Sequence, residues 1–121
     1  MLAITMGAIP GAMSRYYLTE FCKKAIGKNF PYGTLLINFT GCLLMGFFFT
    51  LFKEIPGFPP NLDLMVRTGF LGSYTTFSTY GFDTFALWEN GKKGATIFYW
   101  IGSATLAIIG ILLGRYFATL L

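Results

Sequence analysis

The chain has 121 residues, of which 55% are apolar and only 12% charged, and its formal net charge is +4. This composition, with a mean hydropathy of +0.61, is hard to reconcile with a water-soluble domain and favours an all-α integral membrane protein. The nine basic residues are scattered and form no run that could follow a phosphate backbone, which excludes nucleic acid as an expected partner.

Four segments of the chain are long and apolar enough to be transmembrane helices, since about 20 residues cross about 30 Å of hydrocarbon. They are predicted at about residues 2–21, 32–52, 64–88 and 94–114, and together they make one transmembrane domain, residues 1–121. The first has no basic stretch before it, which argues against a cleaved signal peptide. The third differs from the others because it contains Arg67, Asp83 and a polar run from Ser73 to Thr79.

The connections between these segments are too short to hold a soluble domain, so neighbouring helices are predicted to run antiparallel. Four helices enclose little interior, and a wide aqueous pathway would therefore need a second copy of the chain. The basic residues give only a weak orientation signal. One face of the membrane would hold Lys53, Arg67 and Arg115, and the other would hold Lys23, Lys24, Lys28, Lys92 and Lys93. So small a bias permits insertion in both orientations.

Polar side chains at membrane depth are costly and tend to face a partner or an ion pathway. Thr34 and Asn38 lie on one face of the second segment, one helical turn apart. The Asn38 amide either donates hydrogen bonds to an anion or bonds to a neighbouring helix. Tyr99 and Ser103 have the same spacing in the fourth segment, where their hydroxyls either face an anion or bond to their own backbone.

The third segment contains a stretch, Gly69 to Gly81, that is a poor continuous helix because it combines glycines, β-branched residues and hydroxyls. Non-helical backbone in a membrane must have its polar groups satisfied by protein or by a water-filled cavity. A break here predicts free carbonyls near Gly72 to Thr75 for a hard cation, and free N–H groups after it for an anion. Phe77 and Tyr80 share a face of the following half-helix, where their ring edges either contact an anion or pack against other helices.

Enzymatic chemistry is not expected of this sequence. The chain has no histidine, no G-x-S-x-G or H-E-x-x-H motif and no phosphate-binding glycine loop. Its two cysteines, Cys22 and Cys42, have no C-x-x-C spacing, and both are predicted to be structural thiols.

Three stretches of the sequence, Gly7 to Tyr16, Pro31 to Gly41 and Gly69 to Tyr80, resemble the signatures of the Fluc (CrcB) fluoride channels. The resemblance covers the whole chain, and its most specific part is Thr75-Thr76-Phe77-Ser78-Thr79. It implies an antiparallel, dual-topology homodimer with two pores. Such a dimer would export fluoride passively from the cytoplasm across a bacterial plasma or inner membrane.

The resemblance also implies roles for individual residues. Asn38 and Phe77 would line the fluoride path, with Tyr80 at the second position of the family's phenylalanine pair. The remaining polar track would comprise Thr34, Ser78, Thr79, Tyr99 and Ser103. Arg15 would supply positive charge near a pore entrance, and Asp83 stands where a glutamate is expected. The backbone carbonyls of Gly72 and Thr75 would hold a central sodium ion at the dimer interface.

Two other functions remain open from the sequence. A small multidrug transporter also has four helices and about this length, but it needs a membrane-embedded carboxylate, and Glu20 is the only acid in the first segment. A structural membrane subunit would have no need of a polar, broken third segment.

Overall fold

The computed structural model describes residues 1–27 and 29–121, and every regular element within these ranges is a helix. Three of the helices are long: α1 (Leu2–Ala25), α2 (Tyr32–Glu54) and α6 (Lys93–Thr119). The stretch between α2 and α6 is divided into α3 (Pro60–Asp63), the π-helical η1 (Leu64–Leu71), α4 (Gly72–Tyr74) and α5 (Phe77–Glu89). Lys28, one of the basic residues weighed for orientation, lies outside the described residues. This all-helical architecture is consistent with a membrane protein.

The three long helices continue past the ends predicted for them. The predicted segments ended before the lysines that follow them, whereas the last turns of α1 and α2 include Lys23, Lys24 and Lys53. A lysine is compatible with a helix end because its charge interacts favourably with the C-terminal carbonyls and its stem can reach toward water. By length and hydropathy alone, α2 and α6 are each long and apolar enough to cross a bilayer.

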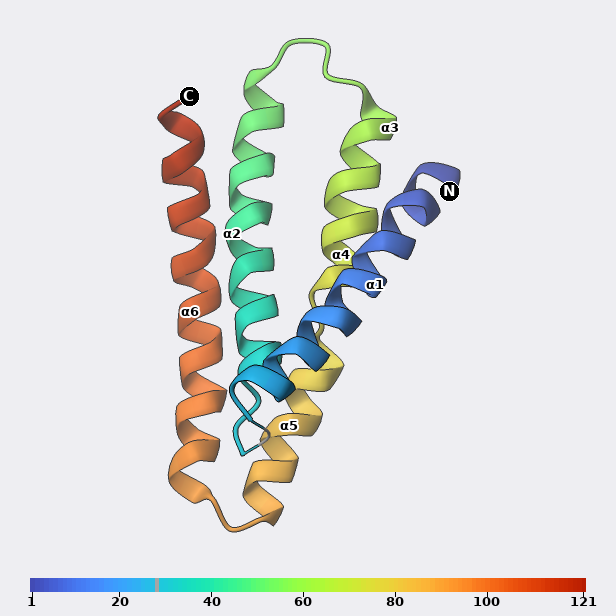
Figure 1. The fold of residues 1–121 in the computed structure, drawn as a ribbon. Coiled ribbons are helices and arrows are strands. Elements are labelled where there is room, and N and C mark those ends of the chain that lie inside the picture. The colour runs from blue at the N-terminus through green and yellow to red at the C-terminus, as the bar shows by residue number, and fades with distance from the viewer. Residues whose placement is uncertain (28) are drawn as a thin grey trace.

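Helices α2 and α6 lie side by side along most of their length (Figure 1). Glycines allow this approach: a Cβ placed on Gly110 would lie 3.0 Å from the Phe39 carbonyl oxygen, and one on Gly114 would overlap the Leu43 carbonyl. Gly46 of α2 faces the backbone of Ile111 in the same way. The Gly110 and Gly114 pair therefore serves packing within the chain.

Helix α1 crosses η1 and α4 obliquely (Figure 1). Gly7 and Gly11 form its contact surface, because a Cβ on either would overlap backbone or side-chain atoms of the η1 and α4 region. The hydroxyl of Ser73 donates across this contact to the Ala8 carbonyl at 2.9 Å. Glycine spacing in the first segment thus fixes the position of the helix that precedes the break.

A two-residue break separates α4 from α5. Thr75 has φ −81° and ψ 156°, and Thr76 has φ −149° and ψ 124°, so both residues are extended. Thr76 then caps α5, with its hydroxyl accepting a hydrogen bond from the Thr79 N–H at 3.3 Å. The cap satisfies one of the N–H groups that every helix start leaves without an internal partner.

Arg67, a charged residue of the third segment, is engaged near the end of the molecule that carries the α2–α3 loop. Its guanidinium donates two hydrogen bonds to the Asp63 carboxylate and lies 5.2 Å from the centroid of the Phe49 ring. The neighbouring guanidinium holds the pKa of the Asp63 carboxyl below its usual range. Arg67 therefore has a local anionic partner, which accounts for its position in an otherwise apolar stretch.

Candidate functional site

The side chain of Asn38 holds the break in place. Its Nδ2 donates to the Thr76 carbonyl at 3.0 Å, and its Oδ1 accepts from the Thr76 N–H at 2.9 Å. Both backbone groups of Thr76 are thereby satisfied by one amide on α2. An asparagine amide has two N–H groups, so this pairing leaves one donor available. Asn38 bonds across helices, and it retains a donor that an anion could use.

At the break, the N–H groups of Thr76 and Thr79 donate to side chains instead of to the backbone carbonyls that they would bond in a continuous helix. In an α-helix the carbonyl of residue i accepts from the N–H of residue i+4. The helical partner of the Gly72 carbonyl is the Thr76 N–H, which donates to Asn38 instead. The helical partner of the Thr75 carbonyl is the Thr79 N–H, which donates to the Thr76 hydroxyl. Gly72 and Thr75 are therefore the two carbonyls that lose their helical donors to side chains.

A cavity of about 250 Å³ opens beside the break, between α2, α5 and α6. Its lining combines polar and aromatic side chains from Asn38, Cys42, Thr75, Thr76, Phe77, Tyr80 and Ser103, together with two alanines of α6. Ser103 is only 7% exposed, and within the described part of the chain its Oγ has no hydrogen-bond partner. A buried hydroxyl without a partner is costly, so its presence here points to a ligand in the cavity.

The two aromatic residues of α5 differ in how they are held. The Phe77 side chain is 83% exposed and projects away from the core of its own chain. Tyr80 packs against Phe77 and Tyr99, with ring centroids 5.7 and 5.4 Å away, and its hydroxyl donates to the Trp100 carbonyl of α6. The extra hydroxyl of Tyr80 is thus used to hold the ring against α6.

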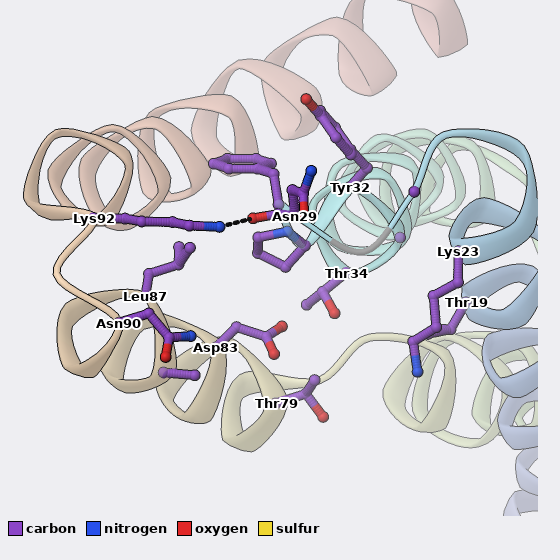
Figure 2. Close-up of a pocket in the computed structure, with 15 residues that line it drawn as sticks. Thr19, Lys23, Asn29, Tyr32, Thr34, Thr79, Asp83, Leu87, Asn90 and Lys92 are labelled. Atoms are coloured by element: carbon purple, nitrogen blue, oxygen red, sulfur yellow. Dashed lines mark hydrogen bonds between the residues drawn. The ribbon is translucent and has the colours of Figure 1, made fainter.

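A second, larger cavity of about 420 Å³ lies at the end of the molecule formed by the α1–α2 and α5–α6 loops. Figure 2 shows its side chains, with Thr34, Asp83 and Thr79 lying between Lys92 and Lys23 in this view. The Asp83 carboxylate accepts a hydrogen bond from the Tyr99 hydroxyl at 3.3 Å. Tyr99 is fully buried and its ring contacts Tyr80 as well, so it connects the lining of the two cavities.

The structure brings most of the predicted site residues to these two cavities. Asn38, Phe77, Tyr80 and Ser103 line the smaller one, as does Thr75 of the proposed cation pair. Thr34 and Thr79 line the larger one. Ser78 is within hydrogen-bond distance of the Thr76 hydroxyl, at 3.3 Å.

Arg15 is half-buried on α1 and lines neither of these two cavities.

Several lining residues were not singled out in the sequence as part of a site, and Cys42, Lys23 and Lys92 are the most informative of them. Cys42 follows Asn38 by one helical turn, so its place on the same face of α2 could have been predicted from spacing. Lys23 and Lys92 come from a helix end and a loop, and nothing local in the sequence indicates that they meet at one cavity.

The arrangement offers hydrogen-bond donors and aromatic rings at two cavities, and Tyr99 contacts a lining residue of each. The described residues contain no cluster of three or more histidine, cysteine or acidic side chains that could hold a metal ion. Donors of this kind can replace the hydration shell of a small anion, and no single one of them binds tightly enough to trap it.

Comparison with known proteins gives a family. The family model described as CrcB-like protein, Camphor Resistance (CrcB), matches residues 2–115. The chain belongs to the CrcB family. Its CrcB relatives include proteins named "Fluoride-specific ion channel FluC" from Trichormus, Synechocystis and Synechococcus species. The one from Trichormus variabilis is 50% identical over 94% of this chain and 87% of its own length.

The other two CrcB relatives are similarly close over similar lengths. The protein from a Synechocystis species is 48% identical over 97% of this chain and 90% of its own, and the one from a Synechococcus species is 46% identical over 98% and 91%. The matches extend over nearly the whole of each protein. The relatives are named as ion channels, which are not enzymes.

Proposed function

We propose that the chain is a fluoride-selective channel that exports fluoride passively from the cytoplasm through a bacterial plasma or inner membrane. The observation that carries this proposal is the hydroxyl of Ser103, which is buried and has no hydrogen-bond partner among the described residues, in a residue that lines the same cavity as Asn38. Asn38 retains one free N–H, and two uncharged donor residues beside one small space suit a small anion that accepts strong hydrogen bonds. The names of the CrcB relatives support fluoride as that anion.

In the proposed path, fluoride exchanges water for donors one site at a time. It passes Phe77, Tyr80, Asn38 and Ser103, and then Tyr99, Thr34, Ser78 and Thr79. Ring edges carry a partial positive charge and contribute at the positions where no N–H or O–H is available. A negative-inside potential drives an anion outward by about 2.3 kcal/mol per 100 mV. The proposed export therefore needs no energy source besides the membrane potential.

Purified protein in liposomes provides the direct test of selectivity. Vesicles loaded with fluoride and chloride, with a potassium ionophore to carry the balancing current, should release fluoride and retain chloride. Equal release of the two anions would overturn the proposed selectivity, and no fluoride release would overturn the channel itself. A multidrug exchanger would instead release a cationic dye in response to a proton gradient, and a structural subunit would release nothing.

Ser103→Ala tests the observation that carries the proposal. The substitution removes a hydroxyl that has no partner within residues 1–27 and 29–121, so the protein should keep or gain thermal stability. Fluoride efflux should fall by about tenfold, because one hydrogen bond to a charged group is lost from the path. Thr105→Ala is the matched control on α6, since the Thr105 hydroxyl bonds only to its own helix at the Ile101 carbonyl.

Parent-like efflux in Ser103→Ala would remove this hydroxyl from the path. A similar loss in Thr105→Ala would instead assign the effect to general changes in α6.

The proposed assembly is an antiparallel homodimer of four-helix chains with two pores. The need for a second copy is supported by Phe77, which lines the smaller cavity and is nevertheless 83% exposed in a single chain. Phe77, Phe82 and Phe85 are all at least 60% exposed on α5, so this helix presents an aromatic surface on which a second chain could pack in place of lipid.

Cross-membrane reporter fusions at the C-terminus should show both orientations in comparable amounts. One orientation in all molecules would contradict the dual-topology homodimer.

We also propose a structural sodium ion at the dimer interface, held by the carbonyls of Gly72 and Thr75. Support for this cation site comes from the N–H groups of Thr76 and Thr79, which donate to side chains. The two carbonyls are thereby left without the donors that a continuous helix would give them. Carbonyl oxygens are suitable ligands for a hard cation, and Gly72 is exposed on the surface of its own chain. The ion would supply a fixed positive charge between the two pores. Asn38 and Thr76 shape the backbone that presents these oxygens.

A further inference from the structure

The larger cavity contains an arrangement that the path residues alone do not explain. A carboxylate, Asp83, lies among the hydroxyl-bearing residues that line it, where its negative charge repels an approaching anion. Its hydrogen bond from Tyr99 fixes the carboxylate but leaves its charge in place. An anion pathway that ends here therefore needs positive charge nearby.

Two lysines from opposite sides of the cavity can supply that charge. Lys23 comes from the last turn of α1 and Lys92 from the residue before α6, and both line the cavity (Figure 2). The ammonium group of Lys92 donates to the Asn29 carbonyl at 3.1 Å, which leaves two of its three N–H groups unused. Lys23 lies 3.4 Å from Glu20 in an exposed ion pair, which is a weak interaction in water. Both charges remain available to an anion.

The start of α2 adds a smaller contribution of the same sign. Its first turn has no side-chain cap, and Gly33 and Thr34 of that turn line the cavity. Uncapped N–H groups at a helix start carry partial positive charge.

We propose that the larger cavity is an anion-collecting chamber at one end of the fluoride path, in which Lys23 and Lys92 offset Asp83 and raise the local fluoride concentration. This rests on the proposed channel function and assigns Lys23 and Lys92 a role in it. The lysines act on capture rather than on passage, so their effect is largest when fluoride is dilute. It also decreases with ionic strength, because salt shortens the range of each charge from about 10 Å at 0.1 M to about 3 Å at 1 M.

The test compares four proteins in liposomes: the parent, Lys23→Gln/Lys92→Gln, Lys93→Gln and Lys23→Arg/Lys92→Arg. At low fluoride and low ionic strength, the double glutamine variant should conduct about threefold to tenfold less than the parent. The difference should shrink at saturating fluoride, or when a salt of a large impermeant anion is added. Lys93→Gln is the matched control, because it removes the neighbouring positive charge of a lysine that does not line the cavity. The Lys93 ammonium lies over the Trp88 ring instead, 5.3 Å from its centroid.

The arginine pair separates charge from packing and should conduct like the parent. A double glutamine variant equal to the parent at low ionic strength would overturn the chamber, as would an equal loss in Lys93→Gln or a failure of the arginine pair to restore flux. A parent that carries no fluoride would instead overturn the channel function itself.

Discussion

Asn38→Asp should reduce fluoride flux by about 100-fold or more, because it places an anionic group beside the path of an anion. An ionised aspartate accepts hydrogen bonds but donates none. It can still accept from the Thr76 N–H, but it cannot donate to the Thr76 carbonyl, which Asn38 does at 3.0 Å. The substitution thus removes the free donor from the cavity and half of the contact that holds the break. The measurement is initial fluoride efflux from liposomes, with the oligomeric state checked by size-exclusion chromatography.

Two further variants separate these two effects of Asn38→Asp. Asn38→Ala removes both hydrogen bonds to Thr76 without adding charge, so any additional loss in Asn38→Asp measures repulsion of the anion. Asn61→Asp is the matched control, because Asn61 is exposed on α3 and lines neither cavity of the proposed path. Parent-like flux in Asn38→Asp would show that Asn38 only joins helices and takes no part in conduction.

The sequence left two interpretations of Asn38, donor to an anion or bond between helices, and the structure shows why spacing could not choose between them. The partner of the amide is Thr76, which lies far along the chain and whose backbone is free only because of the break. Composition predicted that the Gly69 to Gly81 stretch would be a poor helix. It could not predict that the extended residues would be Thr75 and Thr76, because a contact from α2 selects them.

The long helices could be predicted more directly, because uninterrupted apolar runs and short loops restrict the chain to a few antiparallel arrangements. The π-helical form of η1 could not be predicted, since nothing in the composition of Leu64 to Leu71 distinguishes a π-helix from an α-helix. The hydroxyl of Tyr80 was a similar case. This hydroxyl donates to the Trp100 carbonyl of another helix. The ring of Tyr80 could be placed near the path from the sequence, but the partner of its hydroxyl could not be predicted.

Complete removal of sodium should stop fluoride flux, and this second large effect follows from the carbonyls at the break. If the Gly72 and Thr75 carbonyls of two antiparallel chains face one another, four oxygens meet in a low-dielectric region, and without a cation they repel. Replacing sodium with a large organic cation should therefore lower the thermal stability of the dimer as well as its flux. The melting temperature provides a readout that does not depend on conduction.

The competing explanation for these carbonyls is a bond from a nearby hydroxyl or from ordered water. The Ser73 hydroxyl is within hydrogen-bond distance of the Ala8 and Gly69 carbonyls, and the Thr76 hydroxyl donates to the Thr79 hydroxyl. The Thr75 hydroxyl donates to the Leu71 carbonyl, so ordered water is the main alternative. Water has no net charge, so a water-filled site would make the dimer indifferent to the cation in the buffer. Anomalous scattering from a heavier monovalent cation exchanged into the site would distinguish the two. Fluoride flux that continues after every bound cation has been removed would refute an essential ion. It would show that repulsion among the Gly72 and Thr75 carbonyl oxygens is too weak to disrupt the conducting dimer.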